Sequence, residues 1–150
     1  EVIKMNDSIT FKINDLTRFE NLQKVFYQLK QDKENRSFNV EEFYLKFFDE
    51  KAKSYFGWYS EAENKDWSEK WFSTPYEQRW TDPTLKRKWD FGSMLMSLED
   101  GDYQLISCEL ISEDKAKLLF YPFGHPYGGT GCLEALIESF GFEIIEIDTA

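Results

Sequence analysis

The sequence predicts a single α+β domain, an antiparallel β-meander with helices packed on one face. Two amphipathic helix patterns lie in the first half of the chain, where apolar residues recur three and four positions apart. Short alternating segments separated by turn residues fill the last third. Since 150 residues suit one domain, we divide it into a helical, aromatic-rich part, 14–90, and a meander with a further helix and strand, 91–150.

The chain begins with two short apolar segments, 2–5 and 8–13, which indicate one or two strands. Asn14 follows as an N-cap residue and opens a helix of about 15 residues. The polar run 31–37 is expected to end this helix. Its apolar positions lie on one face: Leu16, Phe19, Leu22, Phe26 and Leu29.

A second helix is predicted to begin at Asn39, which forms a capping-box pattern with Glu42. Phe38 and Phe43 flank this start with the spacing of a hydrophobic staple. The apolar residues that follow keep the helical spacing of three and four: Val40, Phe43, Tyr44, Phe47 and Phe48.

All five tryptophans lie between residues 55 and 91, together with six other aromatic residues. Trp67 and Trp71 are one helical turn apart, as are Tyr76 and Trp80, and Pro75 is placed to begin a short helix. Aromatic rings among polar groups stack on sugars or nucleobases in some proteins. Short, irregular helices also need large side chains to close a core, and we favour this core interpretation.

The last third contains the three strands of the predicted meander. Alternation of apolar residues predicts the first strand over 93–98. Asp100 and Gly101 then supply the hairpin signal of an Asp-Gly turn. The second and third strands and the turn between them are expected at 103–111, 116–121 and 112–115.

A glycine-rich loop, a helix and one more strand complete the chain. The loop, 121–132, holds the single histidine and four of the eight glycines. Apolar spacing predicts a helix over 131–140, and Gly141 supplies its C-terminal stop. The final strand is expected at 142–147.

The start of the last helix carries the residues with the most reactive chemistry. A helix N-terminus lowers the pKa of a cysteine, which makes Cys132 a candidate thiolate. His125, seven residues earlier, is a candidate base for a Cys–His pair. In the alternative interpretation Cys132 points into the core, where free cysteines usually lie, and His125 is a surface residue. Cys108 shares a strand face with Ile106 and Leu110 and is expected in the core.

The net charge of −10 resides in residues 89–150, which hold 12 acidic residues against Lys115 and Lys117. Such a field repels nucleic acid and anionic membranes and attracts basic partners, or serves only solubility. No apolar run is long enough to span a bilayer. Two cysteines form no disulfide framework and favour a reducing cytoplasm, although the chain starts at Glu1 without a methionine, as after removal of a leader. One histidine and two separated cysteines argue against a zinc site, and no motif predicts a cofactor.

The leading functional hypothesis is a non-enzymatic binding protein that engages a basic protein through its acidic last third. Its size, acidity and aromatic content are similar to those of toxin-neutralising immunity proteins, although no motif identifies that family. The alternative is a small enzyme or ligand-binding domain that uses the loop 124–132 with Cys132 and His125, and sugar binding by the tryptophan segment comes third. We expect the basic partner to contact exposed acids and a stiff aromatic loop: Glu99, Asp100, Asp102, Glu109, Glu113, Asp114, Tyr121, Phe123, His125 and Tyr127.

Overall fold

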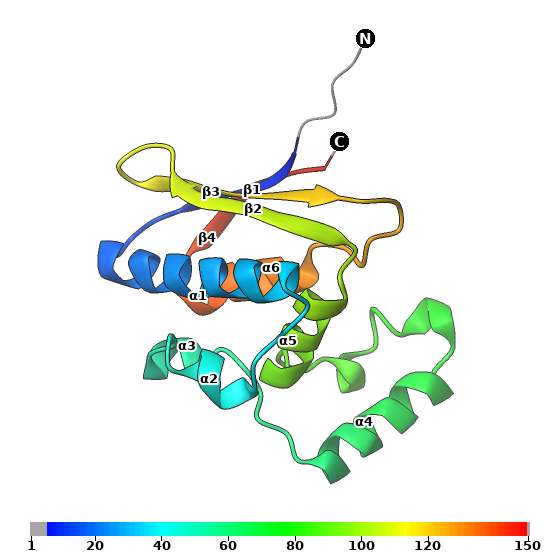
Figure 1. Ribbon diagram of the computed structural model, residues 1–150. Coiled ribbons are helices and arrows are strands. Elements are labelled where there is room, and N and C mark those ends of the chain that lie inside the picture. The colour runs from blue at the N-terminus through cyan, green and yellow to red at the C-terminus, as the bar shows by residue number, and fades with distance from the viewer. Residues whose placement is uncertain (1–5, 150) are drawn as a thin grey trace.

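The computed structural model describes residues 6–149, and within them it shows six α-helices and a four-stranded antiparallel sheet (Figure 1). The strand order is β2-β3-β1-β4, so the first strand of the chain lies inside the sheet. This arrangement confirms the α+β class. The strands are β1 (Asp7–Lys12), β2 (Tyr103–Leu110), β3 (Lys115–Pro122) and β4 (Glu143–Asp148).

Helices α1 and α6 lie on the same side of the sheet, whereas α4 projects away from the rest of the chain (Figure 1). Two 3₁₀ turns, Tyr76–Gln78 and Pro83–Leu85, follow α4. The helices are α1 (Leu16–Glu34), α2 (Glu41–Leu45), α3 (Glu50–Lys53), α4 (Glu61–Ser73), α5 (Phe91–Asp100) and α6 (Gly131–Ser139).

The core lies between the sheet and its helices, and alternating strand residues supply one side of it. On β3 the buried residues are Ala116, Leu118, Phe120 and Pro122, every second position. On β1 the ring of Phe11 lies 5.8 Å from that of Phe142 and 6.1 Å from that of Phe19 on α1. The predicted strand at 8–13 is confirmed in β1, and the segment 2–5 lies outside the described residues.

Helix α1 begins one residue later than the sequence indicates. Its N-cap is Asp15, whose carboxylate accepts a hydrogen bond from the backbone N–H of Arg18 at 3.0 Å, while the side chain of Asn14 donates to the carbonyl of Gly141 at 3.0 Å. The helix ends at Glu34, inside the polar run 31–37 as predicted, and Asp32 within that run is buried and accepts a hydrogen bond from the hydroxyl of Tyr44 at 2.6 Å.

The predicted helix after Asn39 is present, but its predicted capping box and its continuation to Phe48 were wrong. Helix α2 spans only Glu41–Leu45, and its N-cap, Val40, forms no side-chain cap. The side chain of Asn39 donates instead to the carboxylate of Asp32 at 2.9 Å, and its backbone N–H donates to the hydroxyl of Tyr44. A tertiary hydrogen bond to α1 has thus replaced the local cap.

The predicted first strand of the meander is helix α5. Asp90 caps it, since its carboxylate accepts hydrogen bonds from the backbone N–H and hydroxyl of Ser93 at 2.9 and 3.1 Å. Gly101 ends α5 rather than turning a hairpin, and its N–H donates to the carbonyl of Ser97. The buried face of α5 follows the helical spacing: Phe91, Met94, Leu95 and Leu98. The meander therefore shrinks to the hairpin β2–β3, with β1 pairing next to β3.

The remaining elements of the last third are confirmed. Strands β2 and β3 pair in antiparallel register around a turn, in which the N–H of Ile111 donates to the carbonyl of Lys115 at 2.9 Å. Helix α6 and strand β4 lie at the expected positions. Gly141 between them has a φ of 85°, the left-handed conformation that ends many helices.

Candidate functional site

The glycine-rich loop connects β3 to α6 and is fastened to the start of β2. The backbone N–H of Phe123 donates to the carbonyl of Asp102 at 3.0 Å, and the N–H of Asp102 donates to the carbonyl of Tyr127 at 3.0 Å. Gly128 and Gly129 have φ values of 100° and 77°, so both need the conformational freedom of glycine. Backbone geometry therefore accounts for these glycines without a phosphate ligand.

The candidate nucleophile Cys132 is buried at the start of α6. Its Sγ lies 3.2 Å from the hydroxyl of Tyr103 on β2. Burial raises the pKa of the Cys132 thiol, and the hydrogen bond with Tyr103 and the charge of Lys33 only partly oppose this. The expectation of a lowered pKa was wrong because desolvation outweighs the helix terminus. Burial also raises the pKa of Cys108, which is in the core as expected.

The candidate base His125 is an exposed loop residue. Its ring lies edge-on to that of Tyr127, with centroids 5.4 Å apart. Within residues 6–149 no hydrogen bond joins His125 to Cys132. The enzyme hypothesis therefore has neither a thiolate nor an assembled Cys–His pair to support it.

The six candidate acids are all exposed, and five of them lie in two groups at opposite ends of β2. Glu99, Asp100 and Asp102 lie between the end of α5 and the start of β2, beside the glycine-rich loop. Glu113 and Asp114 lie in the turn after β2. A strand of eight residues separates the groups by roughly 25 Å.

The sixth acid, Glu109, is engaged by α1. Its carboxylate accepts hydrogen bonds from the side-chain amide of Gln23 at 2.8 Å and from the hydroxyl of Tyr27 at 2.9 Å. Tyr27 also accepts a hydrogen bond from the backbone N–H of Cys108 at 3.1 Å. Glu109 therefore helps to fasten α1 to β2, a structural contact that the sequence did not indicate.

The aromatic residues of the loop divide between core and surface. The ring of Tyr127 contacts those of Tyr103 and Phe120, at centroid distances of 6.2 and 6.0 Å, and this fastens the loop to the core. Phe123 is 62% exposed and has the half-buried Tyr121 as a ring neighbour at 6.1 Å. Phe123 is therefore the loop residue that presents an apolar surface to solvent next to the first acidic group.

Lys33 of α1 lies beneath this acidic group. Its ammonium donates to the carbonyls of Leu98, Glu99 and Gly101 at 2.7, 3.0 and 2.7 Å, where the last turn of α5 leaves carbonyls without helical partners. Burial lowers the pKa of Lys33, while Cys132 and the nearby acids oppose this. The side chain of Lys33 thus stabilises the end of α5 by binding main-chain carbonyls there.

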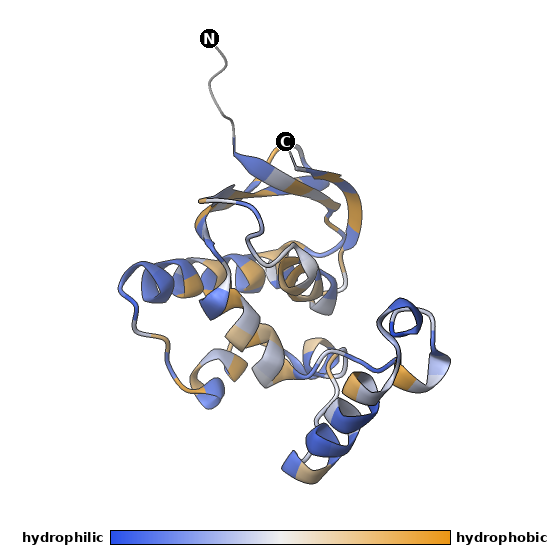
Figure 2. Cartoon of the chain, turned by 90° about the vertical axis from the view of Figure 1, so that its right-hand side faces the viewer, coloured by the Kyte–Doolittle hydropathy of each residue, from blue (hydrophilic) through white to orange (hydrophobic). Residues whose placement is uncertain are grey.

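A second region of interest is the aromatic arm, which we define as residues 58–89. The chain leaves the rest of the molecule at Gly57 and returns at Asp90, where the two residues form an isolated parallel bridge. The N–H of Gly57 donates to the carbonyl of Trp89 at 2.8 Å and closes the base of the arm. Figure 2 shows α4 as a mostly hydrophilic ribbon standing apart from the body, the residues 6–57 and 90–149.

The core interpretation of the tryptophan segment was wrong for most of its aromatic residues. Helix α4 has no buried residue, and the exposed fractions of Trp80, Phe72 and Tyr76 are 64%, 73% and 65%. Phe56 and Phe91 at the base of the arm are buried in the core. The reason is architectural: α4 is covered on one side by the two 3₁₀ turns and has no second layer on the other.

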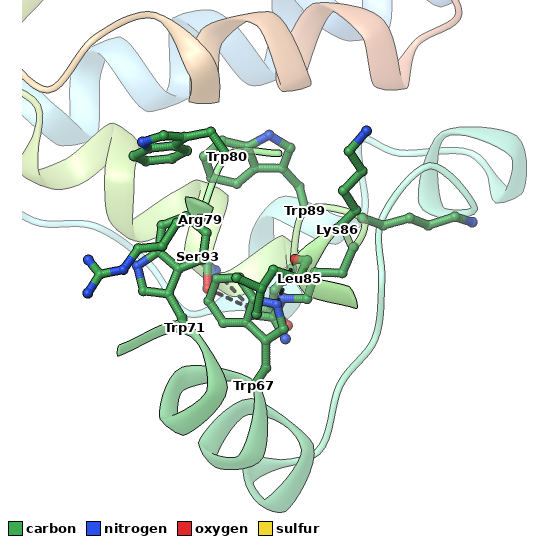
Figure 3. A pocket seen from close by; sticks show the side chains of 11 residues that line it. Trp67, Trp71, Arg79, Trp80, Leu85, Lys86, Trp89 and Ser93 are labelled. Atoms are coloured by element: carbon green, nitrogen blue, oxygen red, sulfur yellow. Dashed lines mark hydrogen bonds between the residues drawn. The ribbon is translucent and has the colours of Figure 1, made fainter. Parts of the chain in front are cut away.

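The arm and the start of α5 enclose a cavity of about 500 Å³ (Figure 3). In that view Trp67 and Trp71 reach into it from α4, and Trp80 and Trp89 lie above them. The sequence analysis did not predict this cavity. The signal that could have indicated it is the run of basic residues among the tryptophans, at Lys86, Arg87 and Lys88. The lining residues are Trp67, Trp71, Arg79, Trp80, Leu85, Lys86, Arg87, Lys88, Trp89, Asp90 and Ser93.

Within residues 6–149, no group of three or more His, Cys, Asp or Glu side chains is placed to hold a metal ion. In the same part of the chain, no helix combines the length and apolar character needed to cross a membrane. Comparisons with protein-family models, with curated proteins and with solved structures found no match. The glycine-rich loop with its neighbouring acids and the aromatic arm are the two candidate sites.

Proposed function

We propose that this chain is a non-enzymatic binding protein whose partner is a basic protein. The proposed contact surface consists of Glu99, Asp100 and Asp102 together with Phe123 of the adjoining loop. The observation that carries the proposal is the pair of backbone hydrogen bonds between Asp102 and the loop, which hold exposed carboxylates beside an exposed phenyl ring. An immunity-type inhibitor of a basic toxin is the specific form that we propose.

The charges of this surface support a basic partner. The three carboxylates are exposed, and the nearest cation below them, Lys33, donates its hydrogen bonds to main-chain carbonyls rather than to a carboxylate. Lys33 offsets part of this charge, since it interacts electrostatically with all three acids, but residues 89–150 hold 12 acidic residues against two lysines and stay strongly negative. Complementary charge accelerates association and fixes orientation, more than it adds affinity.

Phe123 supplies the apolar contact that charge alone does not give. Its ring is 62% exposed, while the ring of Tyr127 at the other end of the loop is held by Tyr103 and Phe120. A preorganised loop loses little entropy on binding, and buried aromatic anchors carry much of the energy of protein interfaces. The other predicted acids, Glu109, Glu113 and Asp114, lie toward the far end of β2 and are outside the proposed surface.

The proposal is tested by isolating the partner and then measuring its association rate. A cross-linking capture from the source cell identifies the partner, which we expect to have a basic isoelectric point. We then compare Asp100→Lys/Asp102→Lys with Glu113→Lys/Asp114→Lys, two variants that change the net charge equally. The first is expected to slow association several-fold and to flatten its salt dependence, because it reverses charge inside the contact.

The matched variant is expected to change the rate by less than about twofold, since its charges lie outside the contact. An acidic partner, or an association rate that responds equally to both variants, would overturn the proposed surface. Equal unfolding transitions for the two variants and the parent chain confirm that the fold is intact.

A further inference from the structure

We propose that the cavity of the aromatic arm binds a small ligand with a flat aromatic ring and a negatively charged group, such as a phosphate or a carboxylate. The site is separate from the protein-binding surface proposed above, because it lies between α4, the two 3₁₀ turns and the start of α5. Its walls, its charges and its polar groups each point to this class of ligand.

The walls are flat aromatic surfaces. The rings of Trp67 and Trp71 are stacked at 5.2 Å with an interplanar angle of 25°, and Trp80 meets Trp71 edge-on at 4.9 Å. The indole N–H of Trp67 donates to the carbonyl of Leu85 at 2.9 Å and fixes its ring. Trp80 is 64% exposed, so one wall of the cavity is open to an incoming ring. Because Trp71 and Arg87 both lie against the ring of Trp67, the exposed ring of Trp80 is the surface on which a planar ligand would stack.

Four basic residues line the cavity, Arg79, Lys86, Arg87 and Lys88, and the ammonium of Lys88 donates to the carbonyl of Ser54 at 2.9 Å. The guanidinium group of Arg87 lies 4.1 Å from the ring centre of Trp67 and donates to the side-chain carbonyl of Asn64 at 2.9 Å. Arg79 lies 5.7 Å from the ring centre of Trp71 and donates to the carbonyl of Thr74 at 3.0 Å. The arginines are thus held in place by neutral groups, with their charges uncompensated.

No ion pair within residues 6–149 includes any of these four cations. In the same part of the chain the ion pairs include only Arg18, Lys30, Lys53 and Lys70 among the basic residues, so the four cations of the cavity are unpaired like most others. Asp90 is the carboxylate that lines the cavity, and it caps α5 through Ser93. An anionic ligand in the cavity would interact with these cations directly, in a setting where aromatic walls reduce the competition from water.

The same features disfavour other small ligands. A cationic ligand would be repelled by the four positive side chains. A neutral sugar needs hydrogen-bonding partners for its hydroxyls beside the aromatic face, yet the lining polar pair Asp90 and Ser93 is already hydrogen-bonded within itself. The cations would also contribute little to the binding of a neutral molecule.

The test is a titration of the full chain with AMP and with indole-3-acetate, followed by tryptophan fluorescence and by calorimetry. Adenosine and glucose serve as neutral probes. We expect at least one of the two anions to bind with a submillimolar dissociation constant and about tenfold more tightly than adenosine and glucose. Which anion binds more tightly decides between phosphate and carboxylate.

Two pairs of variants locate the binding. Trp80→Ala is expected to weaken binding of the anion about tenfold. Trp58 is also a tryptophan of the arm, is 51% exposed and does not line the cavity, so Trp58→Ala is expected to change binding less than about twofold. Lys86→Gln should weaken the anion several-fold and leave adenosine unchanged, with Lys65→Gln on α4 as control.

Failure of both anions to bind, tighter binding of glucose, or equal effects of Trp80→Ala and Trp58→Ala would each overturn the proposal. Since Trp80 is largely exposed, its variant is expected to fold, and its thermal unfolding curve checks this. The outcome is independent of the protein partner, because neither the probes nor the variants involve the surface at Asp102.

Discussion

In the body, aromatic rings lie between the sheet and its helices and are almost fully buried: Phe11, Phe19, Phe120, Phe140 and Phe142. In the aromatic arm, residues of the same kind line an open cavity or face solvent, as Trp80, Phe72 and Tyr76 do. The body has a sheet and helices that cover each other, whereas α4 is covered only by short turns. Aromatic content alone therefore does not identify a core, because burial requires a second layer.

The two regions also differ in how their charges are compensated. In the body, Arg18 forms a two-pronged ion pair with Asp49, at 2.8 and 3.0 Å, between α1 and the start of α3. In the arm, the cations beside the tryptophans contact rings and neutral carbonyls. In the body an ion pair joins two helical elements, whereas in the arm the arginines beside the tryptophans form no ion pair with any residue in the described part of the chain.

The largest expected effect comes from truncating a ring of the body. Phe120 is fully buried and its ring contacts those of Tyr103 and Tyr127. Phe120→Ala is expected to lower the free energy of unfolding by about 3–5 kcal/mol, through lost burial and the resulting cavity. Denaturant unfolding with fitted midpoints and slopes measures this. A loss below about 1 kcal/mol would break the distinction between a packed body and a loosely covered arm.

A smaller effect is expected at the ion pair of the body. Burial by itself would raise the pKa of Asp49, but hydrogen bonds from Arg18 and from the N–H of Ala52 outweigh it, and the net pKa is lowered. A carboxyl group with a lowered pKa in the folded state adds stability above its unfolded pKa of about 3.9, which is lost as the pH falls.

The variant Asp49→Asn should therefore be less stable than the parent chain at neutral pH, by roughly 0.5–1.5 kcal/mol given its partial exposure. The difference should shrink as the pH falls through the acidic range. Unfolding curves recorded from neutral to acidic pH measure it, and Lys86→Gln in the arm is the control. A constant difference across pH would show that the charge of Asp49 contributes nothing.

The smallest effect is expected in the arm. Phe72 is 73% exposed, so Phe72→Ala should change the free energy of unfolding by no more than about 0.5 kcal/mol. Amide hydrogen exchange should also be faster in α4 than in α1, because α4 buries no residue. Equal protection of the two helices would mean that the arm unfolds together with the body.

The hairpin β2–β3, helix α6 and strand β4 were predictable because neighbouring residues determine them. Strand alternation has a period of two, the turn at 112–115 is polar, and Gly141 takes the positive φ that stops α6. Sequence also predicted that Glu99, Asp100 and Asp102 are exposed. The placement of those acids beside Phe123 depends on hydrogen bonds between distant segments, which no local pattern contains.

Helix α5 shows why the remaining predictions failed. Met94, Met96 and Leu98 fit a strand, while Met94, Leu95 and Leu98 fit a helix, so the sequence contained both patterns. The cap from Asp90 and the burial of the second set against the core selected the helix.

The sequence by itself determined the class of fold, the acidity of the last third and the secondary structure that short-range periodicity specifies. Only the tertiary structure decided the environment of Cys132, because Tyr103 reaches it from 29 residues away and burial by other elements raises its pKa. The same is true of the cavity, whose four tryptophans come together only when α4 and the two 3₁₀ turns fold back toward α5. Burial and proximity are properties of the assembled chain, and they set pKa values, cavities and exposed surfaces.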